Sequence, residues 1–340
     1  MKLSSRILSL IGLIYSVVMS IRNGLFEFGV LKQHKSTIPI ISIGNLSMGG
    51  TGKTPHIAFI IRNLKHNKKV VLSRGYGRKR KDLIDGDSKK HSCKDIGDEP
   101  RELLEKFDSE NFKIIVNANR KDALNYLEKI EYKTDIILLD DGYQHRYVKR
   151  DLNILLTDIN KPFYLDSVFP SGSLRERKKG ANRADLIIVT KCIPNLSLQE
   201  QNIIRNKIKT YSKAPIYFSF IKYLGFKNTQ NKFIELTTQG KYLLITGIAF
   251  PSYIKDYLSS KQFDFKHMSY DDHHDFSDKE IKEIAKKSCK FDGIITTEKD
   301  WMRLRDKNIH SETNSVFYRL EIEVKLLHSE KQFMKHLNQI

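Results

Sequence analysis

A glycine-rich segment that follows an apolar run at residues 38–43 carries the residue types best suited to chemistry. Its glycines let backbone N–H groups turn toward a polyphosphate, and a helix that starts there directs its positive end at the same point. In such a loop the lysine reaches the β- and γ-phosphates and the next hydroxyl binds Mg²⁺. The predicted nucleotide contacts are Gly49, Gly50, Thr51, Gly52, Lys53 and Thr54.

The loop departs from the strict GxxxxGK[ST] pattern at one position, where Ser47 replaces a glycine. GTP-binding proteins with such a loop also carry an [NT]KxD motif after a late strand. Here Thr190 and Lys191 are followed by Ile193 where that motif has its aspartate. The sequence therefore predicts ATP rather than GTP as the nucleotide.

Paired carboxylates end a second apolar run, residues 135–139, with Asp140 and Asp141. Enzymes with a phosphate-binding loop use an acid at the end of a neighbouring strand to hold Mg²⁺ or its water. We therefore expect these two acids near the loop.

Short β-branched runs alternate with helix-length segments through the first two-thirds of the chain, which indicates an α/β fold with a mostly parallel sheet sandwiched by helices. The expected strands are residues 40–43, 69–73, 113–117, 135–139, 153–157 and 185–190.

After Pro215 the pattern changes. Residues 216–224 and 315–324 read as two long strands around a compact α/β unit, so they could form a two-stranded linker to a smaller domain. Inside this unit we expect strands at residues 242–245 and 293–297 and a helix at 278–288. The predicted regions are an N-terminal membrane-associating helix (1–24), a P-loop domain (25–215), a smaller α/β domain with linker strands (216–324) and a C-terminal helix (325–340).

The chain has 340 residues and a net charge of +19, which favours anionic partners such as nucleic acid, an acidic membrane or a phosphorylated substrate. No helix-turn-helix, zinc or RNA-binding motif is present, so we expect no nucleic acid. Three scattered cysteines, Cys93, Cys192 and Cys289, fit a reducing cytosol rather than a disulfide framework.

Residues 7–21 are uncharged and lie between Arg6 and Arg22. Fifteen helical residues reach about 22 Å, short of the roughly 30 Å hydrocarbon core of a bilayer. The apolar residues recur at helical spacing with serines on the other side, which favours an interfacial helix or shallow anchor. A cleaved signal peptide and an ordinary packed helix are the alternatives.

Eight motifs occur in a distinctive order: GNLSMGGTGKTP, SRGYGR, GDEP, DDGYQHR, PSGSLRE, TGIAFP, a DHH near residue 272, and TTEKDW. Their order over residues 44–301 resembles that of the tetraacyldisaccharide 4'-kinase (lipid A 4'-kinase) family. The resemblance implies a P-loop domain, a two-stranded linker to a smaller α/β domain, and a hydrophobic N-terminal helix that docks on the membrane.

The resemblance also implies a function: transfer of the ATP γ-phosphate to the 4'-hydroxyl of a tetraacyldisaccharide 1-phosphate in lipid A biosynthesis. We therefore expect an ATP- and Mg²⁺-dependent monomer at the cytoplasmic face of the bacterial inner membrane, with an anionic glycolipid substrate. A P-loop ATPase switch or metallochaperone is the alternative, and it would lack a base for a sugar hydroxyl.

By the same resemblance, Asp98 in GDEP is the base and His273 in DHH pairs with it across the cleft, with His274 as the alternative partner. Lys53 completes the catalytic set. The implied Mg²⁺ ligands are Thr54, Glu99, Asp140 and Asp141, and the implied phosphate or substrate contacts are Arg120, Gln144, Arg175 and Glu176. We expect the charged residues of TTEKDW only to cap and pair at a strand-to-helix turn. At residues 271–275 we expect no metal ion, because adjacent histidines point apart and rarely bind the same ion.

Overall fold

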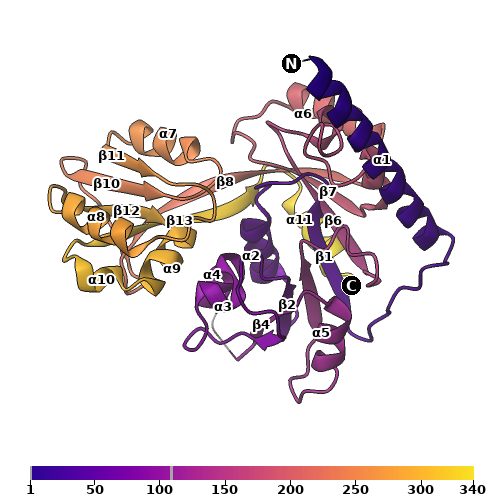
Figure 1. The fold of residues 1–340 in the computed structure, drawn as a ribbon, viewed down its shortest axis with the longest axis horizontal. Coiled ribbons are helices and arrows are strands. Elements are labelled where there is room, and N and C mark those ends of the chain that lie inside the picture. Colours follow the sequence, from indigo (N-terminus) through magenta and orange to yellow (C-terminus); the bar gives the residue numbers. More distant parts are fainter. Residues whose placement is uncertain (1, 108–109) are drawn as a thin grey trace. The chain divides into compact units, whose positions relative to one another are not determined.

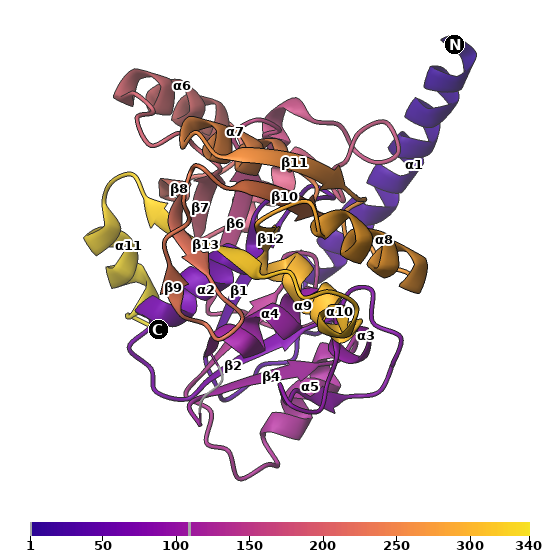
Figure 2. The same cartoon turned by 90° about the vertical axis from the view of Figure 1, so that its left-hand side faces the viewer.

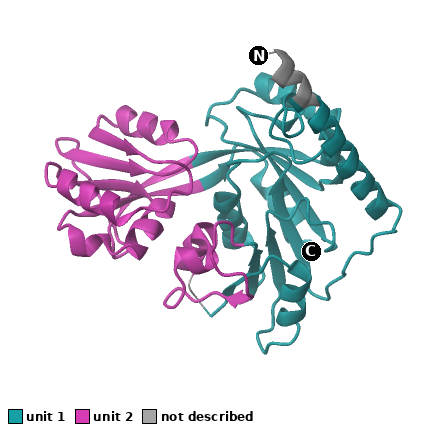
Figure 3. Ribbon diagram, in the orientation of Figure 1, with its two compact units in different colours: residues 1–74, 109–221, 324–340 teal, residues 75–108, 222–323 magenta. Residues whose placement is uncertain are grey.

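The computed structural model describes residues 2–107 and 110–340. Its contacts divide the chain into two compact units (Figure 3). Unit 1 comprises residues 1–74, 109–221 and 324–340, and unit 2 comprises residues 75–108 and 222–323. Two strands, β8 (Ile216–Lys227) and β13 (Phe317–Leu326), run through the unit boundaries. They fall where the sequence predicts linker strands.

Unit 1 is built on parallel strands in the hydrogen-bonded order β8-β7-β6-β1-β5-β2-β4 (Figure 1). The bounds are β1 (Ile40–Asn45), β2 (Lys69–Ser73), β4 (Phe112–Val116), β5 (Ile136–Asp140), β6 (Leu152–Asp158) and β7 (Leu186–Thr190). Each of the six strands expected from the alternating pattern is present. The strands are buried along most of their length, as expected for a parallel sheet covered on both faces.

Helices cover both faces of this sheet. On β8, the Tyr217 ring meets Phe333 of α11 (Glu330–Leu337), while Phe218 shares a core with Ile208 of α6 (Leu198–Lys209). Successive strand side chains point to opposite faces, so α11 and α6 lie on opposite sides. On the α11 side, Phe333 also meets Phe59 of α2 (Lys53–Asn63). Both faces of the sheet are apolar and must be covered by helices, and this requirement produces the predicted α/β fold.

Unit 2 repeats this plan on a smaller scale, with parallel strands in the order β11-β10-β12-β13 (Figure 2). The remaining bounds are β3 (Ile84–Asp85), β9 (Phe233–Ile234), β10 (Lys241–Thr246), β11 (Asp264–Ser269), β12 (Gly293–Thr297), α7 (Ser252–Ser260), α8 (Asp278–Ser288), α9 (Glu298–Asp306) and α10 (Ile309–Glu312). Leu243 and Ile245 of β10 pack with α8, α9 and α10, whereas Tyr242 and Leu244 pack with α7. Strand β11 is half-exposed, and its sequence pattern did not predict a strand.

Residues 75–108 belong to unit 2, although the predicted P-loop domain, residues 25–215, included them. This segment carries α3 (Cys93–Ile96) and α4 (Asp98–Phe107). Glu105 of α4 accepts two hydrogen bonds from Arg305, and the backbone N–H of Cys93 donates to Asp306. These contacts join residues about 200 positions apart, so local periodicity along the sequence carries no sign of them.

Helix α1 (Lys2–Glu27) packs on the rest of unit 1 through small and polar residues and the Phe26 ring, while most of its described aliphatic side chains are exposed. Ser16 is 5% exposed and accepts a hydrogen bond from Arg177, whereas Ile14 is 59% exposed. Gly12 lies so close to the chain that a Cβ there would come within 3.3 Å of Ser171. An 18-residue window, Leu10–Glu27, has the length and composition to cross a membrane, and 17% of it is buried.

Gly44 gives a direct test of packing in unit 1. A Cβ at this position would lie 2.8 Å from the backbone nitrogen of Tyr143, which cannot move freely. We expect Gly44→Ala to lower the free energy of unfolding by about 1–3 kcal/mol through overpacking. Urea unfolding followed by circular dichroism measures this change.

The matched control is Gly24→Ala in α1, where a Cβ would meet nothing closer than 3.9 Å. We expect this helix-interior change to leave stability unchanged or to raise it by up to about 1 kcal/mol. Equal destabilisation by both substitutions would contradict the close approach at Gly44.

Candidate active site

The phosphate-binding loop lies between β1 and α2, as the sequence predicts, and its geometry suits an anion. Gly49 and Gly52 have φ angles of 113° and 84°, which favour glycine. The hydroxyl of Thr51 accepts a hydrogen bond from Asn45, and its carbonyl accepts one from Thr190. Thr51 therefore shapes the loop from within, while α2 directs its N-terminus at the loop.

The loop accommodates Ser47, where the strict pattern has glycine, because its backbone pairs with the segment around Leu174. It forms an antiparallel bridge with Leu174, and the neighbouring Met48 N–H donates to the carbonyl of Ser173. Its φ lies outside the left-handed region, so no glycine is required. The departure from the motif thus leaves the phosphate-facing part of the loop unchanged.

The carboxylate of Asp141 lies between two cations at the end of β5. Lys53 is 3.7 Å away, and Arg175 donates a hydrogen bond of 2.8 Å. Burial raises the pKa of Asp141, but the charges of Lys53 and then Arg175 outweigh it, so the net pKa is lowered. The structure therefore brings together three predicted site residues, from the loop, the DDGYQHR motif and the PSGSLRE motif.

Asp140 is buried at the adjacent position. Its side chain accepts a hydrogen bond from Ser73 at the end of β2. Its carbonyl accepts one from Arg120, the first residue of α5 (Arg120–Leu127). Arg120 is itself almost fully buried and also donates to the carbonyl of Asn117. In this structure Arg120 joins the ends of β4 and β5, and its side chain presents little surface to a substrate.

A metal ion fits this corner of unit 1. The Oδ1 atom of Asp141 is buried and accepts no hydrogen bond from the described part of the chain. Thr54, the second residue of α2, is also buried. Among the described residues no three His, Cys, Asp or Glu side chains form a metal cluster. This is the donor set of Mg²⁺ sites, which take one or two carboxylates and rely on substrate phosphates and water for the rest.

Glu176 and Gln144 connect the loop to α1. Glu176 is 2% exposed and accepts hydrogen bonds from Arg183, Asn23 and Gln144. Gln144 also donates to the carbonyl of Asn45 at the end of β1. Glu176 is thus enclosed by its partners, so it orients α1 and Gln144 rather than offering an open carboxylate.

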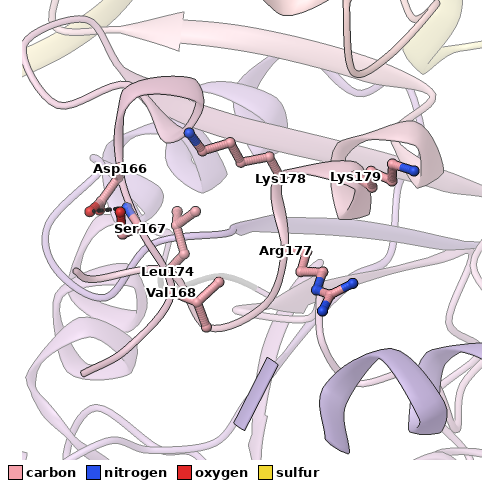
Figure 4. Close-up of a pocket in the computed structure, with 7 residues that line it drawn as sticks. All are labelled: Asp166, Ser167, Val168, Leu174, Arg177, Lys178 and Lys179. Carbon is pink, nitrogen blue, oxygen red and sulfur yellow. Dashed lines mark hydrogen bonds between the residues drawn. The ribbon is translucent and has the colours of Figure 1, made fainter. Parts of the chain in front are cut away.

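A hollow of about 340 Å³ lies near this network (Figure 4). It is lined by Asp166, Ser167, Val168, Leu174, Arg177, Lys178 and Lys179. The three basic side chains point in different directions, and Lys178 donates to the carbonyl of Tyr164. These charges do not converge on one anion.

Unit 2 holds the second group of predicted residues. The Nδ1 atom of His273 lies 2.9 Å from the Oδ2 atom of Asp98, the first residue of α4. His274 instead pairs with Glu280 and stacks on Tyr270. The structure therefore favours His273 over His274 as the partner. We expected this pair to span a cleft between domains, but both residues belong to unit 2.

Cations hold Asp98 in its charged form. Lys299 lies 3.9 Å and Arg303 3.7 Å from Oδ2. Burial raises the pKa of Asp98, but the hydrogen bond from His273 and the charge of Lys299 bring it down to about 2. Glu99, a predicted Mg²⁺ ligand, is the next residue of α4 and is half-buried. It lies in unit 2, whereas Thr54, Asp140 and Asp141 lie in unit 1.

Lys299 and Arg303 belong to this cluster but were not among the site residues predicted from the sequence. Lys299 lies in the TTEKDW motif, which we expected only to form a cap at a turn. The cap exists, since Thr297 accepts a hydrogen bond from the N–H of Asp300. The signal available in the sequence was the positive charge of Lys299 within TTEKDW, one of the motifs that carry the family resemblance.

Comparison with known proteins assigns the family. A sequence model described as LpxK, tetraacyldisaccharide-1-P 4'-kinase, matches residues 4–340. The chain belongs to this family. A tetraacyldisaccharide 4'-kinase of Flavobacterium psychrophilum is 41% identical over 96% of this chain and 93% of its own length. One of Bacteroides thetaiotaomicron is 38% identical over 95% of this chain and 90% of its own.

The fold agrees with the family. A crystal structure of LpxK from Aquifex aeolicus in complex with ATP matches with a TM-score of 0.76 and 27% identity, covering 97% of both chains. The predicted family, the α/β fold and the predicted kinase class are therefore confirmed. The catalytic and ligand roles of individual residues stay predictions.

The buried side chain of His145, in the DDGYQHR motif, should make the stability of this LpxK family member depend on pH. Burial, and then the charge of Arg120, lower its pKa from 6.5 to about 4. The unfolded chain binds this proton below about pH 6.5 and the folded chain only near pH 4, so stability falls as pH falls between them.

We expect His145→Gln to reduce this loss by about 1–2 kcal/mol between pH 7 and 5. Urea unfolding of parent and variant at the two pH values measures it. An identical loss in both proteins would show that the His145 side chain does not contribute.

Proposed function

We propose that this chain transfers the γ-phosphate of ATP to the 4'-hydroxyl of a tetraacyldisaccharide 1-phosphate, as its family name describes. The observation that carries the proposal is the arrangement of Lys53 and Arg175 around Asp141 beside the phosphate-binding loop. The Aquifex aeolicus LpxK, which covers nearly the whole chain, was crystallised with ATP. We therefore place ATP at this loop.

Phosphoryl transfer is mainly a matter of position and charge. In unit 1 the loop N–H groups would bind the phosphates, and Lys53 would reach the β- and γ-phosphates. Thr54, Asp140 and Asp141 would hold Mg²⁺, with Glu99 as a further predicted ligand. When bound, Mg²⁺ supplies positive charge that neutralises the phosphate oxygens.

In unit 2 we assign Asp98 as the group that takes the hydroxyl proton, oriented by His273. The 4'-oxygen bonds to the γ-phosphorus, the bond from that phosphorus to the bridging oxygen of ADP breaks, and the proton passes to the Asp98 carboxylate. The low pKa of Asp98 keeps it ionised at neutral pH and ready to accept. In a loose transition state little base strength is needed.

We also propose that α1 docks on the cytoplasmic face of the inner membrane. Its outward side presents Leu10, Ile11, Ile14, Val18 and Ile21, each largely exposed. Contiguous exposed apolar surface indicates a membrane or protein partner. A net charge of +19 suits an anionic membrane and an anionic glycolipid. Every group assigned a role lies on one chain, so a monomer is sufficient.

Transfer of labelled γ-phosphate to a tetraacyldisaccharide 1-phosphate in detergent micelles tests the activity. We expect Asp98→Ala to lower kcat by about 10²–10⁴-fold, the range for loss of an acid–base group, and Lys53→Ala to abolish detectable transfer. His273→Ala should impair transfer more than His274→Ala, which serves as its matched control.

ATP hydrolysis that requires Lys53, with no labelled lipid, would instead favour an ATPase switch. Full transfer activity in Asp98→Ala would remove the assigned base.

Membrane docking is tested by the double substitution Ile14→Asn with Val18→Asn. Because each aliphatic side chain removed from water is worth about 1.5–3 kcal/mol, binding should weaken at least tenfold. Flotation with vesicles containing anionic lipid measures binding, and ATP titration should show unchanged affinity.

The matched control is Leu198→Asn with Ile203→Asn, which changes two exposed apolar residues of α6. We expect these variants to bind vesicles like the parent. Equal weakening by both pairs would argue against a specific role of α1.

A further inference from the structure

The TTEKDW motif positions a lysine against the catalytic histidine of unit 2. Lys299 is the second residue of α9, in its first turn and two positions after the capping residue Thr297. Its ammonium nitrogen is 3.0 Å from the Nε2 atom of His273. Lys299 is largely buried, with 16% of its side chain exposed. The same ammonium also lies 3.9 Å from the Oδ2 atom of Asp98, so Lys299 borders both members of the pair.

The two contacts of the imidazole determine where its proton lies. A lysine ammonium donates hydrogen bonds and cannot accept them, so Nε2 of His273 must be the acceptor. A neutral imidazole carries one proton, which must then be on Nδ1. Nδ1 lies 2.9 Å from the Asp98 carboxylate and donates to it. An imidazolium would direct an N–H at the ammonium, with like charges 3.0 Å apart.

The surroundings fix this arrangement from several elements. Asp98 faces His273 from α4, Lys299 faces it from α9, and Asp272 of its own loop lies 3.9 Å from Nε2. The Tyr76 ring contacts the imidazole edge-on. His273 itself has a φ of 61°, an uncommon backbone conformation that persists only where the surroundings impose it.

A buried carboxylate locks the start of α9 to neighbouring loops. Asp300 is fully buried and accepts hydrogen bonds from the Gly247 N–H and from Arg303. Arg303 also donates to the carbonyl of His274, next to the catalytic histidine. Lys299 and His273 are therefore carried by segments whose backbones are tied together, which preserves their contact.

We propose that Lys299 is a positioning residue that holds His273 in the neutral Nδ1–H form and so directs its single N–H at Asp98. This inference deepens the proposed function and rests on it for its effect on turnover. Among the described residues, the hydrogen bonds and ion pairs of the Asp98 side chain all fall on Oδ2. Oδ1 is left to accept the hydroxyl proton, and His273 keeps its own.

The kinetic test compares Lys299→Met, which removes the donor, with Lys299→Arg, which retains a charged donor. We expect Lys299→Met to lower kcat for transfer by ~10- to 100-fold, as for other groups that orient a reacting residue, with KM for ATP unchanged. Lys299→Arg should recover a large part of the rate. Lys282→Met, at an exposed site of α8, should match the parent.

The spectroscopic test does not depend on turnover. In protein labelled with ¹⁵N-histidine, two-bond ¹H–¹⁵N correlations at neutral pH report the protonated nitrogen of each ring, and His273→Gln assigns the signals. We expect the Nδ1–H pattern for His273 in the parent and its loss or mixing in Lys299→Met. Parent signals of an Nε2–H form or an imidazolium would overturn the inference even if Lys299→Met does not fold.

The two proposals can fail separately. A parent that transfers no phosphate to the disaccharide but shows the Nδ1–H pattern would sink the proposed function and support the assigned tautomer. An active parent whose kcat is unaffected by Lys299→Met would overturn the positioning role while the kinase activity stands.

Discussion

A buried carboxylate keeps its charge only where cations or N–H donors face it, and this constraint shapes both units. Asp141 is held between Lys53 and Arg175. Asp98 is held among His273, Lys299 and Arg303. In each case the opposing charges outweigh the cost of burial, so the pKa is lowered. The groups that compensate these acids are also those that a phosphate-transferring site needs.

The same constraint links α1 to the nucleotide loop within unit 1. Glu176 is enclosed and requires donors, which Arg183, Asn23 of α1 and Gln144 supply. Gln144 then donates to Asn45, immediately before the loop. Glu176 thus connects α1 to the loop through hydrogen bonds, and its predicted contact with substrate stays a prediction. Removing one such partner would leave the buried charge uncompensated.

A helix that packs on the core of a soluble protein turns its apolar side inward, whereas α1 turns its apolar side outward. Among its described side chains, Ser16 and the neighbouring Gly12 pack against the rest of unit 1, whereas Ile14 and Val18 face outward. Small residues allow the close approach. Arg177 donates a hydrogen bond to Ser16 and Asn23 donates one to Glu176, while the buried Phe26 ring packs on Tyr147. The apolar side of α1 therefore stays exposed, as the proposed membrane docking requires.

The sequence by itself determined what depends on short spacing. The glycines before Lys53 and Thr54 specify a phosphate loop, and alternating apolar runs specify a parallel sheet, because both properties are local. The order of motifs identified the family, and Asp98 and His273 came from that order. The half-exposed strand β11 escaped detection because its pattern is weakly apolar.

Only the tertiary structure decided what depends on contacts between distant residues. Residues 75–108 belong to unit 2, and His273 rather than His274 pairs with Asp98. Glu176 and Arg120 are enclosed, whereas the apolar side of α1 is exposed. Lys299 lies against His273. The physical reason is the same in each case. Burial, pairing and the direction of a side chain depend on neighbours 20 to 200 residues away, about which a short stretch of sequence carries no information.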